Sequence, residues 1–186
     1  MKAIKFLVAA MAMAFAMSVN AKIFENNHFT VDANVGAKVS SVTVVDPFWG
    51  SFSTSDSQAA FGLGATFQTE IFSTNWITLD WDVFRFAWVA PFNSPGDWDE
   101  LHFKTGARAY SPTFAGDHLR GYTNLDMGYV LGLYKDFKDD VATSSAFGLD
   151  WGIGIQLNKK FSFGYTLQFE SNGKSKNHFF TFGYTF

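Results

Sequence analysis

Cysteine is absent from the 186-residue sequence, and proline occurs only four times. Without cysteine the chain can form no disulfide and no thiolate metal site, and it has no amino-terminal cysteine to carry a lipid. An exported protein of this size that lacks disulfides must be stabilised in another way, either by a sizeable core or by a membrane.

Long apolar runs are absent after residue 21, so we expect no transmembrane helix in the rest of the chain. The first 21 residues resemble a signal peptide: Lys2 and Lys5 precede the uncharged run FLVAAMAMAFAM, and Val19 and Ala21 suit the signal-peptidase site. We expect cleavage after Ala21, which leaves residues 22–186 as one barrel domain. A membrane anchor is the alternative, but the run is shorter than the ~20 residues that an anchor needs.

A surplus of basic residues is missing as well. Of the 14 Lys and Arg residues, 12 remain after the predicted cleavage, against 17 Asp and Glu, so the net charge is about −5. Nucleic-acid binding needs concentrated Lys and Arg, and this composition argues against nucleic acid as a partner.

Aromatic residues are abundant instead, with 23 Phe, six Trp and six Tyr, and they recur at every second position. In SAFGLDWGIGIQL, large apolar residues alternate with small or polar ones from Phe147 to Leu157. A helix, with its period of 3.6, would scatter such residues around its axis. The segments FSFGYTLQFE, FGLGATFQTE and VDANVGAKV alternate in the same way, and we interpret all four as strands with one apolar face.

The whole chain accommodates eight such strands, separated by connections that are alternately long and short. Residues 40–58 form a long connection, for example, whereas NKK is short. This alternation is typical of an up-and-down antiparallel barrel. The predicted strands are residues 29–39, 59–69, 75–89, 101–111, 121–134, 145–157, 160–170 and 176–186.

The third predicted strand breaks the alternation. Trp81 and Val83 define one face, but Arg85 then falls on that face while Phe84 and Phe86 fall on the other. A β-bulge near Val83 would restore a continuous apolar face. Without the bulge, Arg85 would lie among the lipid-facing side chains.

The apolar face could point inward, as in a soluble lipocalin-like barrel, or outward toward lipid. Eight strands enclose an interior just wide enough for side chains, and the many large aromatic residues would overfill it. The opposite face suits a narrow lumen because it is rich in glycine: Gly62, Gly64, Gly128, Gly132, Gly148, Gly152, Gly154, Gly164 and Gly183. We therefore predict an all-β, eight-stranded antiparallel transmembrane barrel after a cleaved signal peptide, with a secreted soluble ligand-binding barrel as the alternative.

The last ten residues, NHFFTFGYTF, place an aromatic residue at every second position: Phe180, Phe182, Tyr184 and Phe186. We expect these four side chains to face lipid, and Phe179, Thr181, Gly183 and Thr185 to face the lumen. This ending resembles the last strand of bacterial outer-membrane proteins, which is the recognition signal for the barrel-assembly machinery. In strand number and pattern the chain resembles the small eight-stranded families: the outer-membrane-protein-X, opacity and W types and the OmpA barrel.

That resemblance implies a porin-like barrel in the cell envelope of a Gram-negative bacterium. It implies the assembly machinery and periplasmic chaperones as partners during biogenesis, and outer-membrane lipid and lipopolysaccharide as the surroundings of a monomer. The expected role is structural or interactive, with restricted passage or binding of small molecules as a further option. We expect no cofactor.

Charged residues fall on the face that is expected to point inward: Asp80, Asp82, Lys104, Arg108, Asp126 and Asp150. If the third and fourth strands pair across PFNSPGDWDE, Asp82 lies near Arg108 and Asp80 near Tyr110. These charges could form an ion path, but charges in a narrow lumen of low dielectric need partners. We favour a salt-bridged polar plug.

Catalysis is the competing hypothesis. The segment FESNGKSKN faintly resembles the H-x-S-N region of outer-membrane lipid A deacylases: Ser171 and Asn172 match, but Phe169 stands where the histidine should be. The general base is therefore missing, and we expect no enzyme activity. No metal-ligand spacing connects the four histidines, which we expect at rims or turns: His28, His102, His118 and His178.

Large aromatic residues also occur in segments that are expected to be loops exposed to water: Phe48, Trp49, Phe52, Phe92 and Trp98. They could contact a host surface or an apolar small molecule. Alternatively they fold back onto the rim and join the aromatic girdle at the membrane surface, which is the interpretation that we favour.

Overall fold

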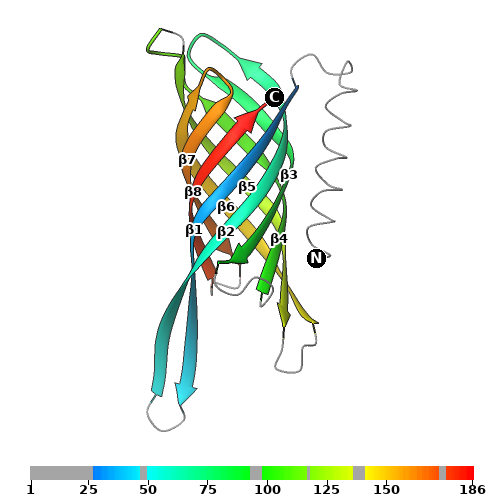
Figure 1. Ribbon diagram of the computed structural model, residues 1–186, viewed down its shortest axis with the longest axis vertical. Helices are drawn as coiled ribbons and strands as arrows, with labels where there is room; N and C mark the ends of the chain where they lie inside the picture. Colours follow the sequence, from blue (N-terminus) through cyan, green and yellow to red (C-terminus); the bar gives the residue numbers. More distant parts are fainter. Residues whose placement is uncertain (1–26, 47–49, 93–97, 117, 136–140, 172–174) are drawn as a thin grey trace.

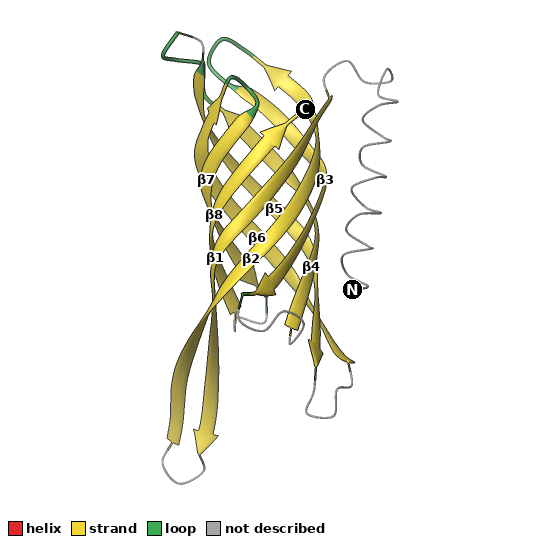
Figure 2. Cartoon of the chain, viewed as in Figure 1, coloured by secondary structure: helices red, strands yellow, loops and turns green. Residues whose placement is uncertain are grey.

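The computed structural model describes residues 27–46, 50–92, 98–116, 118–135, 141–171 and 175–186. These residues form eight antiparallel strands that close into a barrel in sequence order (Figures 1 and 2). The strands are β1 (Asn27–Asp46), β2 (Gly50–Ser73), β3 (Thr78–Pro91), β4 (Trp98–Tyr110), β5 (Leu119–Lys135), β6 (Val141–Leu157), β7 (Phe161–Glu170) and β8 (Ser175–Thr185).

This architecture confirms the predicted all-β fold. Within the described ranges, no helix has the length and hydropathy needed to span a membrane. The predicted signal peptide, residues 1–21, lies outside the described residues.

The barrel is closed by the pairing of β8 with β1. Thr185 lies opposite Thr30, and the amide of Phe186 donates a hydrogen bond to the carbonyl of Phe29 over 2.8 Å. The C-terminus lies at the same end as the β2–β3, β4–β5 and β6–β7 connections, and we call this end the turn end (top of Figure 1). The opposite end, to which the β1–β2 hairpin extends, is the loop end.

The β1–β2 hairpin is longer than the sequence led us to expect, and the prediction of a long loop over residues 40–58 is wrong. Residues 41–46 of β1 pair with residues 50–55 of β2, from Ser41 opposite Ser55 to Asp46 opposite Gly50. This two-stranded ribbon extends beyond the barrel wall (Figure 1). Its β-branched sequence, SVTVV, favours strands, but the segment that pairs with it, SFSTS, is mostly polar and shows no apolar alternation. The other strand bounds agree with the prediction to within four residues.

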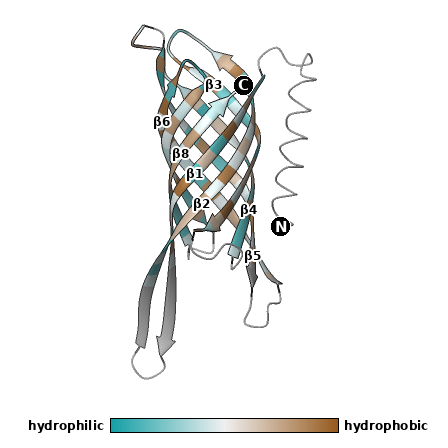
Figure 3. Ribbon diagram, viewed as in Figure 1, coloured by the Kyte–Doolittle hydropathy of each residue, from teal (hydrophilic) through white to brown (hydrophobic). Residues whose placement is uncertain are grey.

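Side chains alternate between the two faces of the wall as predicted. Outward Ile153 and Phe180 are 50% and 55% exposed, whereas inward Gln156 and Thr166 are almost fully buried. Brown apolar and teal polar residues accordingly alternate along the strands in Figure 3. Apolar residues such as Ile153 and Phe180 thus lie on the outer wall, and the face that carries the polar residues lines the lumen.

The predicted bulge in β3 is present. Phe67 of β2 lies opposite Phe84, but its neighbour Gln68 lies opposite Asp82, so Val83 is the extra residue. The β3–β4 register shifts at the same place. As a result Arg85 points into the lumen and is buried, while Phe84 stays on the outer wall.

Candidate functional site

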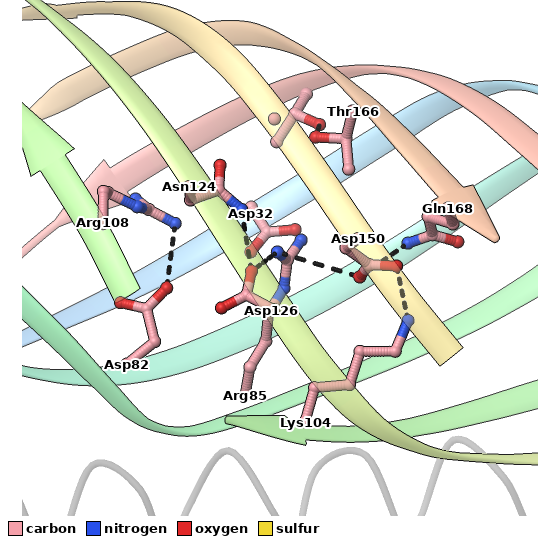
Figure 4. A network of polar contacts seen from close by, with 12 residues as sticks. Asp32, Asp82, Arg85, Lys104, Arg108, Asn124, Asp126, Asp150, Thr166 and Gln168 are labelled. Carbon is pink, nitrogen blue, oxygen red and sulfur yellow. Dashed lines mark hydrogen bonds and ion pairs between the residues drawn. The ribbon is translucent and has the colours of Figure 1, made fainter. Parts of the chain in front are cut away.

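The lumen is the candidate site, because alternation at period two directs many of the strand charges into it. Arg85 occupies its centre (Figure 4), where its Nη1 donates to Asp126 Oδ2 over 2.7 Å and lies 4.0 Å from Asp150 Oδ2. All three side chains are at most 3% exposed. A guanidinium can interact with two carboxylates in this way because its N–H donors form a rigid fork.

Neighbouring strands complete the pairing around Asp150. Lys104 of β4 donates to Asp150 Oδ1 over 2.5 Å, and Gln168 of β7 donates to Asp150 Oδ2 over 3.4 Å. Asn124 donates to Asp126 over 2.7 Å. Each buried charge named here therefore has an opposite charge or an amide beside it, as burial in a low dielectric requires.

A glycine makes room for one part of this network. Gly106 of β4 lies between Asp82 of β3 and Asp126 of β5 in the register of the sheet. A Cβ atom at Gly106 would approach Asp126 Oδ1 to 2.3 Å. The missing side chain thus leaves the space that the Asp126 carboxylate occupies.

The β3–β4 register differs by two residues from the one that we expected. Asp80, not Asp82, lies directly opposite Arg108, and Thr78 lies opposite Tyr110. Arg108 still reaches Asp82 diagonally, with 3.8 Å between Nη2 and Oδ2. The structure thus places Arg108 near both aspartates, because diagonal neighbours in a sheet remain within reach of a long side chain.

At the turn end, stacked aromatic and guanidinium groups fill the lumen. The guanidinium of Arg120 lies 3.6 Å from the centre of the Tyr110 ring, and that of Arg108 lies 5.2 Å from the Tyr122 ring. The two tyrosine rings are 6.2 Å apart. Cation–π contacts of this kind attract a cation to an aromatic face, and Arg108 also has the Asp82 carboxylate nearby.

At the loop end, Lys38 is held between an ion pair and an aromatic ring. It forms a close ion pair with Glu100, and its Nζ lies 4.5 Å from the centre of the Trp98 ring. The Trp98 indole donates to Gln58 over 2.7 Å and packs beside buried Phe179. Trp98 therefore lies at the mouth of the lumen, in strand β4.

His102 corrects the expectation that every histidine lies at a rim or a turn. It is buried in the lumen, where its Nε2 lies 3.3 Å from Glu100 Oε2. The physical reason is that side chains alternate along a strand, so His102 shares the inward face of β4 with Glu100 and Lys104. This alternation was visible in the sequence. His118 lies in the β4–β5 connection, and His28 lies near the start of β1.

His178 lies within β8, three residues from the start of this strand at the loop end. It is hydrogen-bonded through Nδ1 to the hydroxyl of Tyr165 over 2.5 Å. The described residues hold no group of three or more His, Asp and Glu side chains that could bind a metal ion.

Very little space is left between these side chains. The cavity at the centre of the lumen has a volume of about 10 Å³, which is room for about one water molecule. Its lining comes from six strands or more and includes Asp32, Arg85, Arg108, Tyr122 and Asn124. The side chains around this polar cavity thus leave room for about one water molecule.

The five aromatic residues expected in loops have different positions. Phe48 and Trp49 lie outside the described residues, and Phe52 belongs to β2. Phe92 follows β3 and packs on Phe61 of the outer wall, with 5.1 Å between ring centres. Phe92 and Trp98 therefore both pack against the barrel, Phe92 on the outer wall and Trp98 at the mouth of the lumen.

The segment compared with the deacylase motif is bonded to the sheet. Ser171 Oγ accepts a hydrogen bond from the amide of Phe147 over 3.1 Å, and the Ser171 amide donates to the Phe147 carbonyl over 2.7 Å. Phe169 lies in β7, while Asn172 lies outside the described residues.

The closing strand has its alternate aromatic residues on the outer wall, whereas Phe179 is buried. Phe180, Phe182 and Phe186 are 51–61% exposed. Tyr184 is partly covered because its ring packs against Phe161 at 5.0 Å and against Phe186 at 4.8 Å.

Comparison with known proteins identifies relatives of this fold. No family model matches the chain, and no curated protein matches it in sequence. Among solved structures, Neisserial surface protein A matches with a TM-score of 0.55 and 14% identity over 86% of this chain and 95% of that chain. The outer membrane enzyme PagL matches with a TM-score of 0.54 and 16% identity over 84% of this chain and 97% of that chain.

Ail, the attachment invasion locus protein of Yersinia pestis, has a TM-score of 0.48 and 15% identity over 88% of this chain and 100% of its own. At such identities a match reports on the fold alone. The chain has the fold of the small eight-stranded outer-membrane β-barrels.

Proposed function

We propose that this chain is an integral protein of a Gram-negative outer membrane, with a structural or interaction role and a lumen that does not conduct ions. The observation that carries the proposal is the filled lumen: Arg85, Asp126, Asp150 and Lys104 pair with one another across it. The adjacent cavity accommodates about one water molecule. An ion would have to displace several buried ion pairs in order to pass.

The outer wall supports the membrane location. Large apolar side chains are half exposed all around the barrel, for example Leu125, Trp151 and Phe163 at 41–46%. A monomer in water rarely exposes so continuous an apolar surface, whereas a barrel in lipid requires one. The terminal aromatic strand suits recognition by the barrel-assembly machinery and its chaperones, and lipopolysaccharide would surround the loop end.

The region of Ser171 supports the proposal of a non-catalytic role. The one described hydrogen bond to its hydroxyl comes from a backbone amide, which cannot accept a proton from serine. Phe169 occupies the place of the histidine that the deacylase motif requires. The structural neighbours include both an enzyme and a protein of an attachment locus, so they favour neither alternative.

Two measurements test the proposal. Purified from outer-membrane fractions, the protein should migrate faster on a denaturing gel before boiling than after it, as a closed barrel does. Inserted into planar bilayers at neutral pH, it should give no steady conductance, with a general porin as the positive control. Recovery in the soluble periplasmic fraction would contradict the membrane location, and large steady currents would contradict the plug.

A further inference from the structure

The outer wall of β6, β7 and β8 carries an apolar hollow with a volume of about 250 Å³. Its walls are the side chains of Ile153, Ile155, Phe163, Tyr165 and Phe180. A hollow of this size, which lies on the wall proposed to face lipid, suits part of an acyl chain and no bulky polar group.

The hollow has a polar edge on one side. Tyr165 lines the hollow with its ring, and its hydroxyl is hydrogen-bonded to His178 of β8 over 2.5 Å. Lys176 lies two residues further along the outward face of β8, toward the loop end. Its side chain is exposed and forms no ion pair with any residue in the described part of the chain.

The position of Lys176 along β8 corresponds to one edge of the membrane. Ten residues separate it from Phe186, and at about 3.4 Å per residue and a tilt of about 40° they span roughly 25 Å. That distance is the height of the apolar belt of an outer-membrane barrel, about 25 Å. With Phe186 at the turn-end boundary, Lys176 reaches the loop-end boundary, where lipid phosphates lie.

We infer that this surface binds a phosphorylated, acylated lipid, namely the lipid A portion of lipopolysaccharide. The ammonium group of Lys176 meets a phosphate, the Tyr165–His178 pair lies beside the head group, and one acyl chain occupies the hollow below. The inference rests on the proposed function, because only in an outer membrane does the loop end face lipopolysaccharide.

A second copy of the chain is a poorer occupant. In a symmetric dimer the same patch would meet itself, which would place two Lys176 side chains close together in an apolar interface. Like charges in such a position repel each other and lack partners. A phosphate supplies the missing opposite charge.

The test measures lipid binding to the detergent-purified protein by native mass spectrometry, with lipid A and phosphatidylglycerol as separate probes. Lys176→Gln should weaken lipid A binding about fivefold, the usual effect of one basic residue at an anionic lipid surface. Lys160→Gln removes the same charge at the turn end and should bind lipid A like the wild type. Phosphatidylglycerol should bind more weakly and equally to all three proteins.

A second pair of variants tests the hollow. Ile153→Trp should fill it and weaken lipid A binding, whereas Leu125→Trp, which adds the same bulk elsewhere on the outer wall, should not. Equal lipid A binding by Lys176→Gln and Lys160→Gln would overturn the inference. A loss of phosphatidylglycerol binding in Lys176→Gln as large as its loss of lipid A binding would also overturn it. So would a wild-type protein that is dimeric and that Ile153→Trp converts to a monomer, because a second copy would then occupy the hollow.

Heat-modifiable mobility, measured on every variant, separates these results from misfolding. A wild type without this property contradicts the proposed function. Folded variants with unchanged lipid binding contradict only the lipid site.

Discussion

The inner and outer faces of this barrel are built from alternate residues of the same strands, yet they are stabilised differently. On β6, inward Asp150 receives hydrogen bonds or ion pairs from Lys104, Arg85 and Gln168. Outward Ile153, three residues further on, is half exposed and lines an apolar hollow of the outer wall. The comparison teaches that an inward residue depends on particular partners, whereas an outward residue depends on the solvent that it meets.

Removal of one inward charge should have the largest effect on stability. Arg85→Met would leave Asp126 without its ion-pair partner and remove the second cation near Asp150. We expect a loss of about 3–5 kcal/mol, the usual cost of an unpaired buried charge. Urea unfolding of the protein refolded in lipid vesicles measures it.

Arg85→Lys serves as the control, because it keeps the charge and should lose less. A loss below 1 kcal/mol for Arg85→Met would mean that the inner network does not stabilise the barrel.

Insertion of a charge on the outer face should have a smaller effect that depends on depth. Ile153→Arg should cost about 2–4 kcal/mol, as arginine does at the middle of a bilayer. Leu157→Arg, four residues nearer the turn end on the same strand, should cost about 0–1 kcal/mol because its guanidinium reaches the interface.

The same urea titration in vesicles gives both values. Equal costs at the two positions would mean that the outer wall does not cross a bilayer in the proposed orientation.

Addition of a single methyl group should have the smallest effect on stability of the three changes, and it should destabilise the protein only on the inner face. In Gly106→Ala the new Cβ would lie 2.2 Å from the Leu125 carbonyl oxygen, so the strands must shift, at a cost of about 1–3 kcal/mol. Outward Ala107→Val on the same strand adds two methyl groups at an exposed position and should change stability by less than about 0.5 kcal/mol. If Ala107→Val proved the more harmful change, the contrast between the two faces would be wrong.

Much of the fold could be predicted from the sequence, because a two-sided wall needs strict alternation. The break at Arg85 even predicted the bulge at Val83, since the alternative was a buried cation among lipid-facing residues. The charges of the lumen could be assigned to one face for the same reason. The sequence could not predict which of these charges pair with each other. A register error of two residues is enough to place Asp82 instead of Asp80 opposite Arg108.

Other features left no pattern, or a pattern that we did not use. One strand of the β1–β2 ribbon contains the mostly polar segment SFSTS, so apolar alternation did not reveal the ribbon. His102 has the same parity as Lys104, but a histidine suits both rims and lumens, and its residue type misled us. The space around Gly106 depends on the register between β4 and β5, which places Leu125 and Asp126 beside it and which the sequence left uncertain by about two residues.

The pairing of β8 with β1 bears on the order of events during synthesis. Thr30 and Thr185, which bond across this seam, are 155 residues apart in the chain. A ribosome completes β1 long before its second neighbour exists, so the wall cannot become continuous until translation has passed residue 185. Until then β1 lacks one of its two partner strands, and unpaired amides and carbonyls at a strand edge must be protected from premature contacts. Maturation of this protein is therefore post-translational of necessity.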